Sequence, residues 1–93
     1  MKEAVATMEA SLELEEDPQK KAMLYGNIGN CLRETKKYEK ALEYHNMHLE
    51  AATELGDAKS QAMVLHNISN VEFELGNREK AMELRARSKK LME

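Results

Sequence analysis

Asparagine side chains are the residues of this sequence whose spacing most clearly suggests chemistry. Asn27 and Asn30 lie three positions apart, and Asn67 and Asn70 repeat that spacing later in the chain. Residues three apart share one face of an α-helix, so each pair would present two amides side by side. An amide offers both a hydrogen-bond donor and an acceptor, which suits the backbone of an extended peptide. Asparagine is a poor helix former, so we interpret the pairs either as binding groups or as amides that hold neighbouring helices in register.

Further side chains accompany the asparagines on the same predicted helix face. Met23 and Glu34 share the face of the first pair, roughly 120–160° around the helix from Ile28. Arg33 flanks this face and would suit an acidic side chain of a ligand. The second pair has equivalent neighbours and is flanked by a histidine. The candidate peptide-binding residues are therefore Met23, Asn27, Asn30, Arg33, Glu34, Met63, His66, Asn67, Asn70 and Glu74.

Signatures of catalysis are missing from the sequence. It contains no glycine-rich phosphate loop, no H-E-x-x-H motif and no Cys–His pair at a useful spacing. His45 and His48 could in principle hold a metal, but they fall on an apolar stripe with no third ligand nearby in the sequence. We interpret them as a packed, hydrogen-bonded pair. We therefore expect a protein that is not an enzyme, without catalytic residues, a metal, a cofactor or a small-molecule substrate.

Composition limits the classes of partner. The formal net charge is −3, and 42% of the residues are hydrophobic and 33% charged. This balance is typical of a soluble helical protein, and it lacks the basic patch that nucleic acid would require. No apolar run approaches the ~18 residues of a membrane span. Cys31 is the one cysteine and cannot form an internal disulfide, so we expect a cytoplasmic or nuclear location and no membrane partner.

The chain matches itself when it is shifted by 40 residues. The segment 22–45 aligns with 62–85, and the identical positions include both asparagines of each pair. Turn signals recur with the same period, because Gly56 and Gly76 each suit the left-handed end of a helix. Side-chain N-caps are expected at Asp17, Asp57 and Asn77, and a weaker break at 35–37. These signals predict five helices, over 2–16, 18–34, 38–55, 58–75 and 78–91.

Apolar stripes on these helices predict how they pack. Ile28 and Ile68 are expected in the core, and Ala41 and Ala81 where two helices approach closely. The stripes are expected to include Leu55 and Leu75 as well. No single helix can bury its stripe alone, so stacked hairpins are the natural arrangement.

These residues resemble a known repeat family. Tyr25-x2-Ile28-Gly29-x2-Leu32 followed by Ala41-x3-His45 is similar to the tetratricopeptide pattern W-x2-L-G-x2-Y, then A-x3-F. Leu65-x2-Ile68-Ser69-x2-Glu72 with Ala81-x3-Arg85 resembles a second repeat, in which Phe73 would substitute for Glu72. The resemblance implies an all-α solenoid of antiparallel helix hairpins with about two and a half repeats. The single domain 1–93 would then comprise the second half of a repeat (1–17), a repeat (18–57) and a repeat with a capping helix (58–93).

The 40-residue period exceeds the usual 34 and is similar to long repeats of two kinds. These are the spindle-orientation adaptors enriched in Leu-Gly-Asn repeats and the kinesin light chains. The resemblance implies a scaffold or adaptor whose first helix in each hairpin lines a concave groove for an extended peptide or a partner helix. An alternative stays open, namely a self-association module or a fragment of a longer array. Homodimerisation would run through the first or the last helix, and an outer apolar face of Val5, Met8 and Leu12 would favour it.

Overall fold

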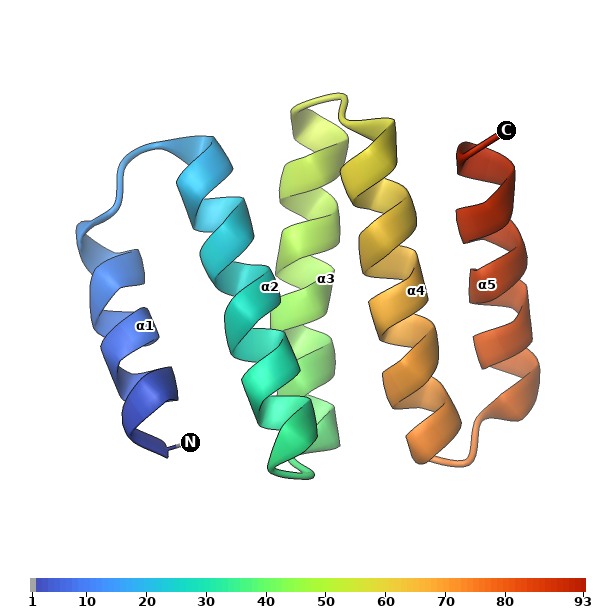
Figure 1. The fold of residues 1–93 in the computed structure, drawn as a ribbon, viewed down its shortest axis with the longest axis horizontal. Coiled ribbons are helices and arrows are strands. Elements are labelled where there is room, and N and C mark those ends of the chain that lie inside the picture. Colours follow the sequence, from blue (N-terminus) through green and yellow to red (C-terminus); the bar gives the residue numbers. More distant parts are fainter. Residues whose placement is uncertain (1) are drawn as a thin grey trace.

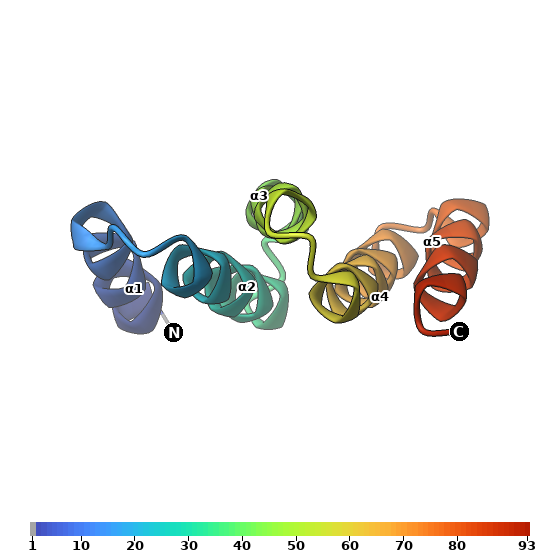
Figure 2. The same cartoon turned by 90° about the horizontal axis from the view of Figure 1, so that it is seen from above.

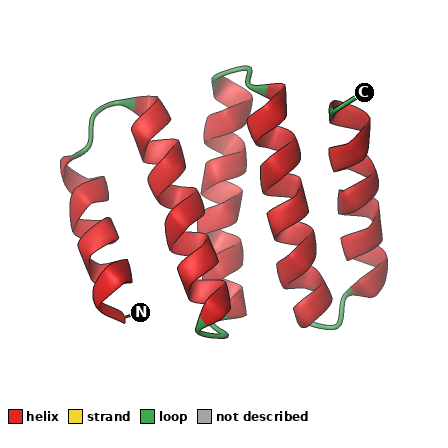
Figure 3. Ribbon diagram, viewed as in Figure 1, coloured by secondary structure: helices red, strands yellow, loops and turns green. Residues whose placement is uncertain are grey.

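Five α-helices make up the described part of the chain. The computed structural model describes residues 2–93, and side chains from residue 4 onward. The helices are α1 (Lys2–Leu14), α2 (Pro18–Glu34), α3 (Tyr38–Glu54), α4 (Ala58–Glu74) and α5 (Arg78–Leu91). Successive helices run in opposite directions, and residues 2–93 contain no strand (Figures 1 and 3). The predicted all-α arrangement of antiparallel hairpins is therefore confirmed.

Helix α1 ends at Leu14, earlier than the predicted 16. The carboxylate of Glu15 accepts hydrogen bonds from the backbone N–H groups of Glu16 and Asp17, which stabilises a turn in place of another helical residue. Asp17 then caps α2, because its Oδ1 accepts from the N–H of Gln19 at 2.9 Å. Pro18 follows at the first helical position, where a missing N–H carries no penalty.

The helices form a flat assembly whose Cα atoms span 35 × 30 × 13 Å. Seen from above, α3 lies in a different layer from α2 and α4 (Figure 2). Helix α3 packs against both of them, whereas α2 and α4 have few contacts with each other. The two hairpins are α2–α3 and α4–α5. Their first helices, α2 and α4, therefore lie on one side of the molecule with α3 behind them.

Three turns share one backbone geometry. The residue after each helix cap has a positive φ, namely Lys36 (63°), Gly56 (67°) and Gly76 (90°). In each turn the following N–H bonds back to a carbonyl five residues earlier, for example from Asp57 to Ala52 at 3.0 Å. The weak sequence signal at 35–37 has a physical reason, because a lysine occupies the left-handed position that glycine fills in the other two turns.

Only two of the three predicted side-chain caps form. Asp57 accepts from the N–H of Ser60 at 3.1 Å, as expected. The predicted cap at Asn77 is wrong, because its side-chain nitrogen donates instead to Glu72 Oε1 at 3.2 Å. Glu72 is buried and charged, so it draws the amide back toward the preceding helix.

The core consists of two clusters that follow the repeat. One contains Ile28, Leu32, Ala41 and Val71, and the other Val64, Leu65, Ile68 and Leu84. Leu42 packs against both clusters and joins them. Ala41 and Ala81 are fully buried, which confirms the predicted positions of close helix contact. Leu55 and Leu75 are instead partly exposed, because each lies at a C-cap beyond the last helical turn.

Helix α1 packs its apolar side chains inward. Val5, Met8 and Leu12 lie against the first core cluster and do not form the outer face on which self-association was expected to depend. The Tyr44 hydroxyl also donates to Glu9 Oε2 at 2.7 Å and links α3 to α1. Burial, together with this hydrogen bond, raises the pKa of Tyr44 to about 12. Helix α1 thus covers the first core cluster on one side of the hairpin formed by α2 and α3.

Glu72 itself, and not Phe73, occupies the core position of the second repeat. Lys80 Nζ lies 3.0 Å from a Glu72 carboxylate oxygen, and this ion pair together with Asn77 offsets the burial of the charge. Phe73 is 50% exposed and lies beneath the guanidinium groups of Arg78 and Arg85, at 5.6 and 5.8 Å from the ring centroid. The expected substitution of Phe73 for Glu72 is therefore wrong.

Among the described helices, none is both long and apolar enough to span a membrane.

Candidate functional site

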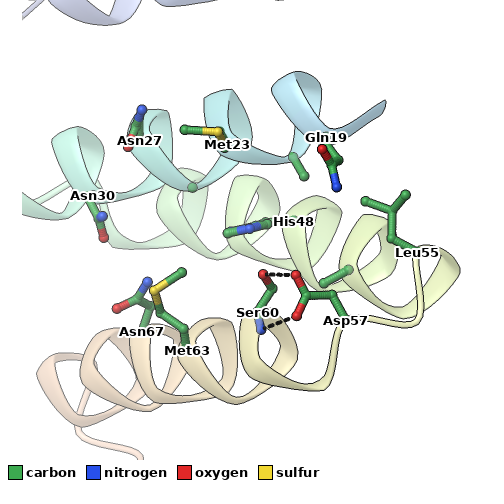
Figure 4. Close-up of a pocket in the computed structure, with 13 residues that line it drawn as sticks. Gln19, Met23, Asn27, Asn30, His48, Leu55, Asp57, Ser60, Met63 and Asn67 are labelled. Atoms are coloured by element: carbon green, nitrogen blue, oxygen red, sulfur yellow. Dashed lines mark hydrogen bonds between the residues drawn. The ribbon is translucent and has the colours of Figure 1, made fainter. Parts of the chain in front are cut away.

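A cavity of about 370 Å³ opens between α2 and α4, with α3 as its floor (Figure 4). We call it the groove cavity. Its floor is made mainly of small residues and one imidazole, and its walls carry amides and thioethers. The residues that line it are Gln19, Ala22, Met23, Gly26, Asn27, Asn30, His48, Ala52, Leu55, Asp57, Ser60, Met63 and Asn67.

Two glycines of α2 let the histidines of α3 come close beneath this cavity. A Cβ atom on Gly26 would lie 2.7 Å from His48 Nδ1, and one on Gly29 would lie 2.7–2.8 Å from atoms of the His45 ring. Contacts this short exclude any larger side chain without a shift of the rings. The close approach of α2 to α3 therefore depends on glycine at both positions.

The two histidines are buried, and most of their ring nitrogens have no partner. Neither nitrogen of His45 forms a hydrogen bond in the described structure, nor does His48 Nδ1. Packing of the pair is thus as expected, but the expected hydrogen bonds at these three atoms are wrong. Burial, with smaller contributions from His48 and Arg33, lowers the pKa of His45 to about 4, and burial also lowers the pKa of His48. Both imidazoles are therefore neutral near pH 7.

Five of the ten candidate residues from the sequence meet at the groove cavity. Met23 and Met63 project from opposite walls and are 64% and 56% exposed (Figure 4). Asn27, Asn30 and Asn67 line the same space. The 40-residue spacing thus brings equivalent side chains of α2 and α4 to a single cavity.

The other five candidates lie elsewhere. Arg33 pairs with Glu74 at 3.5 Å, a contact that links α2 to α4, so its guanidinium already has an acidic partner. Asn70 Oδ1 accepts from Arg85 at 3.3 Å on the α5 side of α4. His66 lines a different cavity, together with Ser88 and Met92. Glu34 is exposed and is not among the residues that line the groove cavity.

Sequence reasoning missed Gln19 and Ser60 as lining residues and treated His48 only as a packed residue. Gln19, Met23 and Asn27 are four residues apart, and Ser60, Met63 and Asn67 continue the equivalent face of α4. The same face rule that grouped the asparagines would have extended each stripe by one turn. The access of His48 to the cavity had no such signal, because it depends on the missing side chain of Gly26.

Charge at the groove cavity is sparse. Asp57 is the one lining residue with a full charge, and its two carboxylate oxygens accept from the N–H and the hydroxyl of Ser60 (Figure 4). These bonds lower the pKa of Asp57, which keeps it ionised at neutral pH. No three histidine, cysteine or acidic side chains of the described residues come together as metal ligands would.

The fold defines a class of protein, the all-α solenoid of antiparallel helical repeats. The sequence profile of the tetratricopeptide repeat matches residues 20–93. The chain belongs to the tetratricopeptide repeat family, whose repeats are generally non-enzymatic modules for protein–protein interaction. No curated protein sequence matches the chain.

Proposed function

We propose that the protein is an adaptor that binds an extended segment of another protein in the groove cavity. The observation that carries this proposal is the meeting of amides from two repeats across one cavity. Asn27 and Asn30 come from α2 and Asn67 from α4. An extended segment lying between the helices would have donors and acceptors for its main chain on both sides.

The state of the three amides supports binding over the alternative that they hold the helices in register. Within the described residues, the side chains of Asn27, Asn30 and Asn67 have no hydrogen-bond partner, whereas Asn70 and Asn77 both have one. An amide that held hairpins together would need a partner on the neighbouring helix. The three groove amides are therefore available to a ligand, and their loss should cost the fold little.

A double substitution tests the proposal. The protein is first screened against a random peptide library, and a selected peptide is labelled for titration. Asn30→Ala with Asn67→Ala should weaken binding of that peptide by about 0.5–1.5 kcal/mol for each hydrogen bond lost, with the melting temperature unchanged. Asn70→Ala is the matched control, because it removes the same group from the same helix outside the cavity, and it should bind like the parent. A double variant that melts early and binds normally would assign the amides to the fold.

Self-association is a second candidate, now through the far end of the molecule. Leu91 and Met92 are exposed at the end of α5, which leaves an apolar surface there. A second copy or a further repeat would cover it. Light scattering at high micromolar concentration tests this candidate. A dimer that Met92→Lys converts to a monomer would support it, and a monomeric parent protein would refute it.

A further inference from the structure

We infer that the groove cavity anchors one large, uncharged, apolar side chain of the bound segment and rejects an acidic one. This inference rests on the proposed peptide-binding function and adds the class of ligand. It differs from the sequence-based expectation of an acidic ligand, which depended on Arg33.

The depth of the cavity comes from small side chains. Ala22 and Gly26 of α2 and Ala52 of α3 line it where larger residues would fill the space. Because Gly26 has no Cβ, His48 can lie against the helix backbone at the floor of the cavity. A ligand side chain that enters would meet methyl groups, a glycine and a neutral imidazole. Such a surface gains most from covering an apolar group.

The walls suit side chains of varied shape. Met23 of α2 and Met63 of α4 lie on opposite walls of the cavity (Figure 4). Thioether side chains are unbranched and adaptable, so two of them can close around either an aliphatic or an aromatic group. The amides stand beside them and would hold the main chain of the ligand. The arrangement therefore has an apolar slot next to polar groups, which is the usual composition of a side-chain pocket.

Charge decides against an acidic anchor. Asp57 is ionised at one end of the cavity, and no lysine or arginine is among the lining residues. Arg33, the cation on which the expectation of an acidic ligand depended, is paired with Glu74 outside the lining. A ligand carboxylate would lose water without gaining a cation and would face a like charge. A cationic anchor has only Asp57 to attract it, and both oxygens of that carboxylate already accept from Ser60.

Peptide selection with matched variants tests the inference. Random dodecapeptides are displayed and selected on the full chain, and a fluorescent copy of the most enriched peptide is titrated. The enriched peptides should share one large apolar residue. Its replacement by Glu in the probe should weaken binding about tenfold or more. Met63→Asp in the protein should have an effect of similar size. Met82→Asp, on a methionine of α5 that is also exposed but lies outside the cavity, should change the affinity less than about twofold.

The outcomes separate this inference from the proposed function. Peptides that share an acidic or basic anchor, and that lose affinity on Asn67→Ala, would overturn the apolar anchor and leave peptide binding in place. If no peptide is enriched, or if neither Asn67→Ala nor Met63→Asp changes the affinity, the groove itself is the wrong site and both proposals fail. Circular dichroism melts of each variant show whether a loss of affinity reflects a loss of fold.

Discussion

The two hairpins, α2–α3 and α4–α5, pair small residues with large ones in the same order at one level and in the reverse order at the next. In the first, Gly29 of α2 faces the large His45 of α3. Forty residues later, Ser69 of α4 faces Arg85 of α5, which donates to the serine hydroxyl at 3.3 Å. At the neighbouring level, Gly26 lies against His48, whereas in the second hairpin the large residue is His66 on α4 and the small one is Ser88 on α5.

The number of helices that cover each position accounts for the difference between His45 and Arg85. Helix α3 lies behind both α2 and α4, and His45 is 0% exposed. Helix α5 packs only against α4 in the described chain, and Arg85 is exposed and hydrogen-bonded to Ser69 and Asn70. Glu72 is also buried, but Lys80 and Asn77 pair with it, whereas neither ring nitrogen of His45 has a partner. A permanent charge would be costly at position 45, so this position takes an aromatic ring that can stay neutral. The position at the end of the stack can keep a guanidinium because water reaches it.

The largest expected effect follows from protonation of His45. Its pKa is about 4 in the folded chain and about 6.5 when unfolded. Between these pH values the unfolded chain therefore binds more protons than the folded chain. The stability that the neutral His45 ring contributes to the fold is fully present above pH 6.5 and is lost as the pH falls toward 4. The loss should reach roughly 3 kcal/mol at pH 4, with His48 acting in the same direction.

Urea unfolding at pH 7 and pH 4 measures this loss. Other carboxylates also titrate in this range, so the comparison is with His45→Leu, which removes the titrating ring while filling similar space. The variant should lose clearly less stability over the same interval. Equal losses of stability in both proteins would mean that burial does not keep His45 neutral. The contrast with Arg85 would then lack its physical basis.

Gly29→Ala probes the close contact of the first hairpin directly. The new Cβ would lie 2.7 Å from the His45 ring, so we expect a loss of about 1–3 kcal/mol from overpacking. For a chain of this size each kcal/mol lowers the melting temperature by roughly 4–8 °C. Ser69→Ala at the equivalent position adds no atom near a ring and should cost only about 0.5–1.5 kcal/mol for its hydrogen bonds. If Ser69→Ala lowered the melting temperature more than Gly29→Ala, the expected order of the two effects would be wrong.

Ala41→Leu and Ala81→Leu compare the two hairpins where they are most alike. Both alanines are buried, so each substitution should cost about 1–3 kcal/mol. We expect the greater cost at Ala41, because α3 is covered on two sides and α5 can move outward. Chemical denaturation of the two variants measures the difference, and an unchanged midpoint for Ala41→Leu would show that the packing register is wrong.

The smallest expected effect concerns the turns. Lys36 holds a left-handed conformation that Gly56 and Gly76 adopt without strain. Lys36→Gly should therefore stabilise the chain by about 0.5–1 kcal/mol, after the added freedom of glycine in the unfolded state is counted. A fall in the melting temperature would mean that the lysine side chain contributes more than its backbone strain costs.

Much of the fold could be predicted because its signals are local. Glycine turns, acidic caps and apolar spacing set the helix bounds: α2 and α5 match the prediction, α3 and α4 each end one residue earlier, and α1 ends two residues earlier. The cap at Asn77 and the burial of Leu55 and Leu75 differ from the prediction. The site could be predicted less completely. The sequence groups Arg33 with Asn30 and Asn70 with Asn67, but the ion pair of Arg33 with Glu74 and the bond of Asn70 to Arg85 depend on contacts between helices. The absence of a hydrogen-bond partner for His45 depends on which copy of the repeat is covered on both sides. Two similar copies of the sequence do not reveal which copy that is.

Methyl NMR on the full chain can show directly whether the peptide binds in the groove cavity. Methionine methyl groups are labelled with ¹³C, and the selected probe peptide is added to saturation. We predict that the Met23 and Met63 signals shift together with the side-chain amides of Asn27, Asn30 and Asn67, while the signal of Met82 on α5 stays in place. Shifts confined to Met82 and Met92, with the groove signals unchanged, would contradict the claim and place binding at the far end of the molecule.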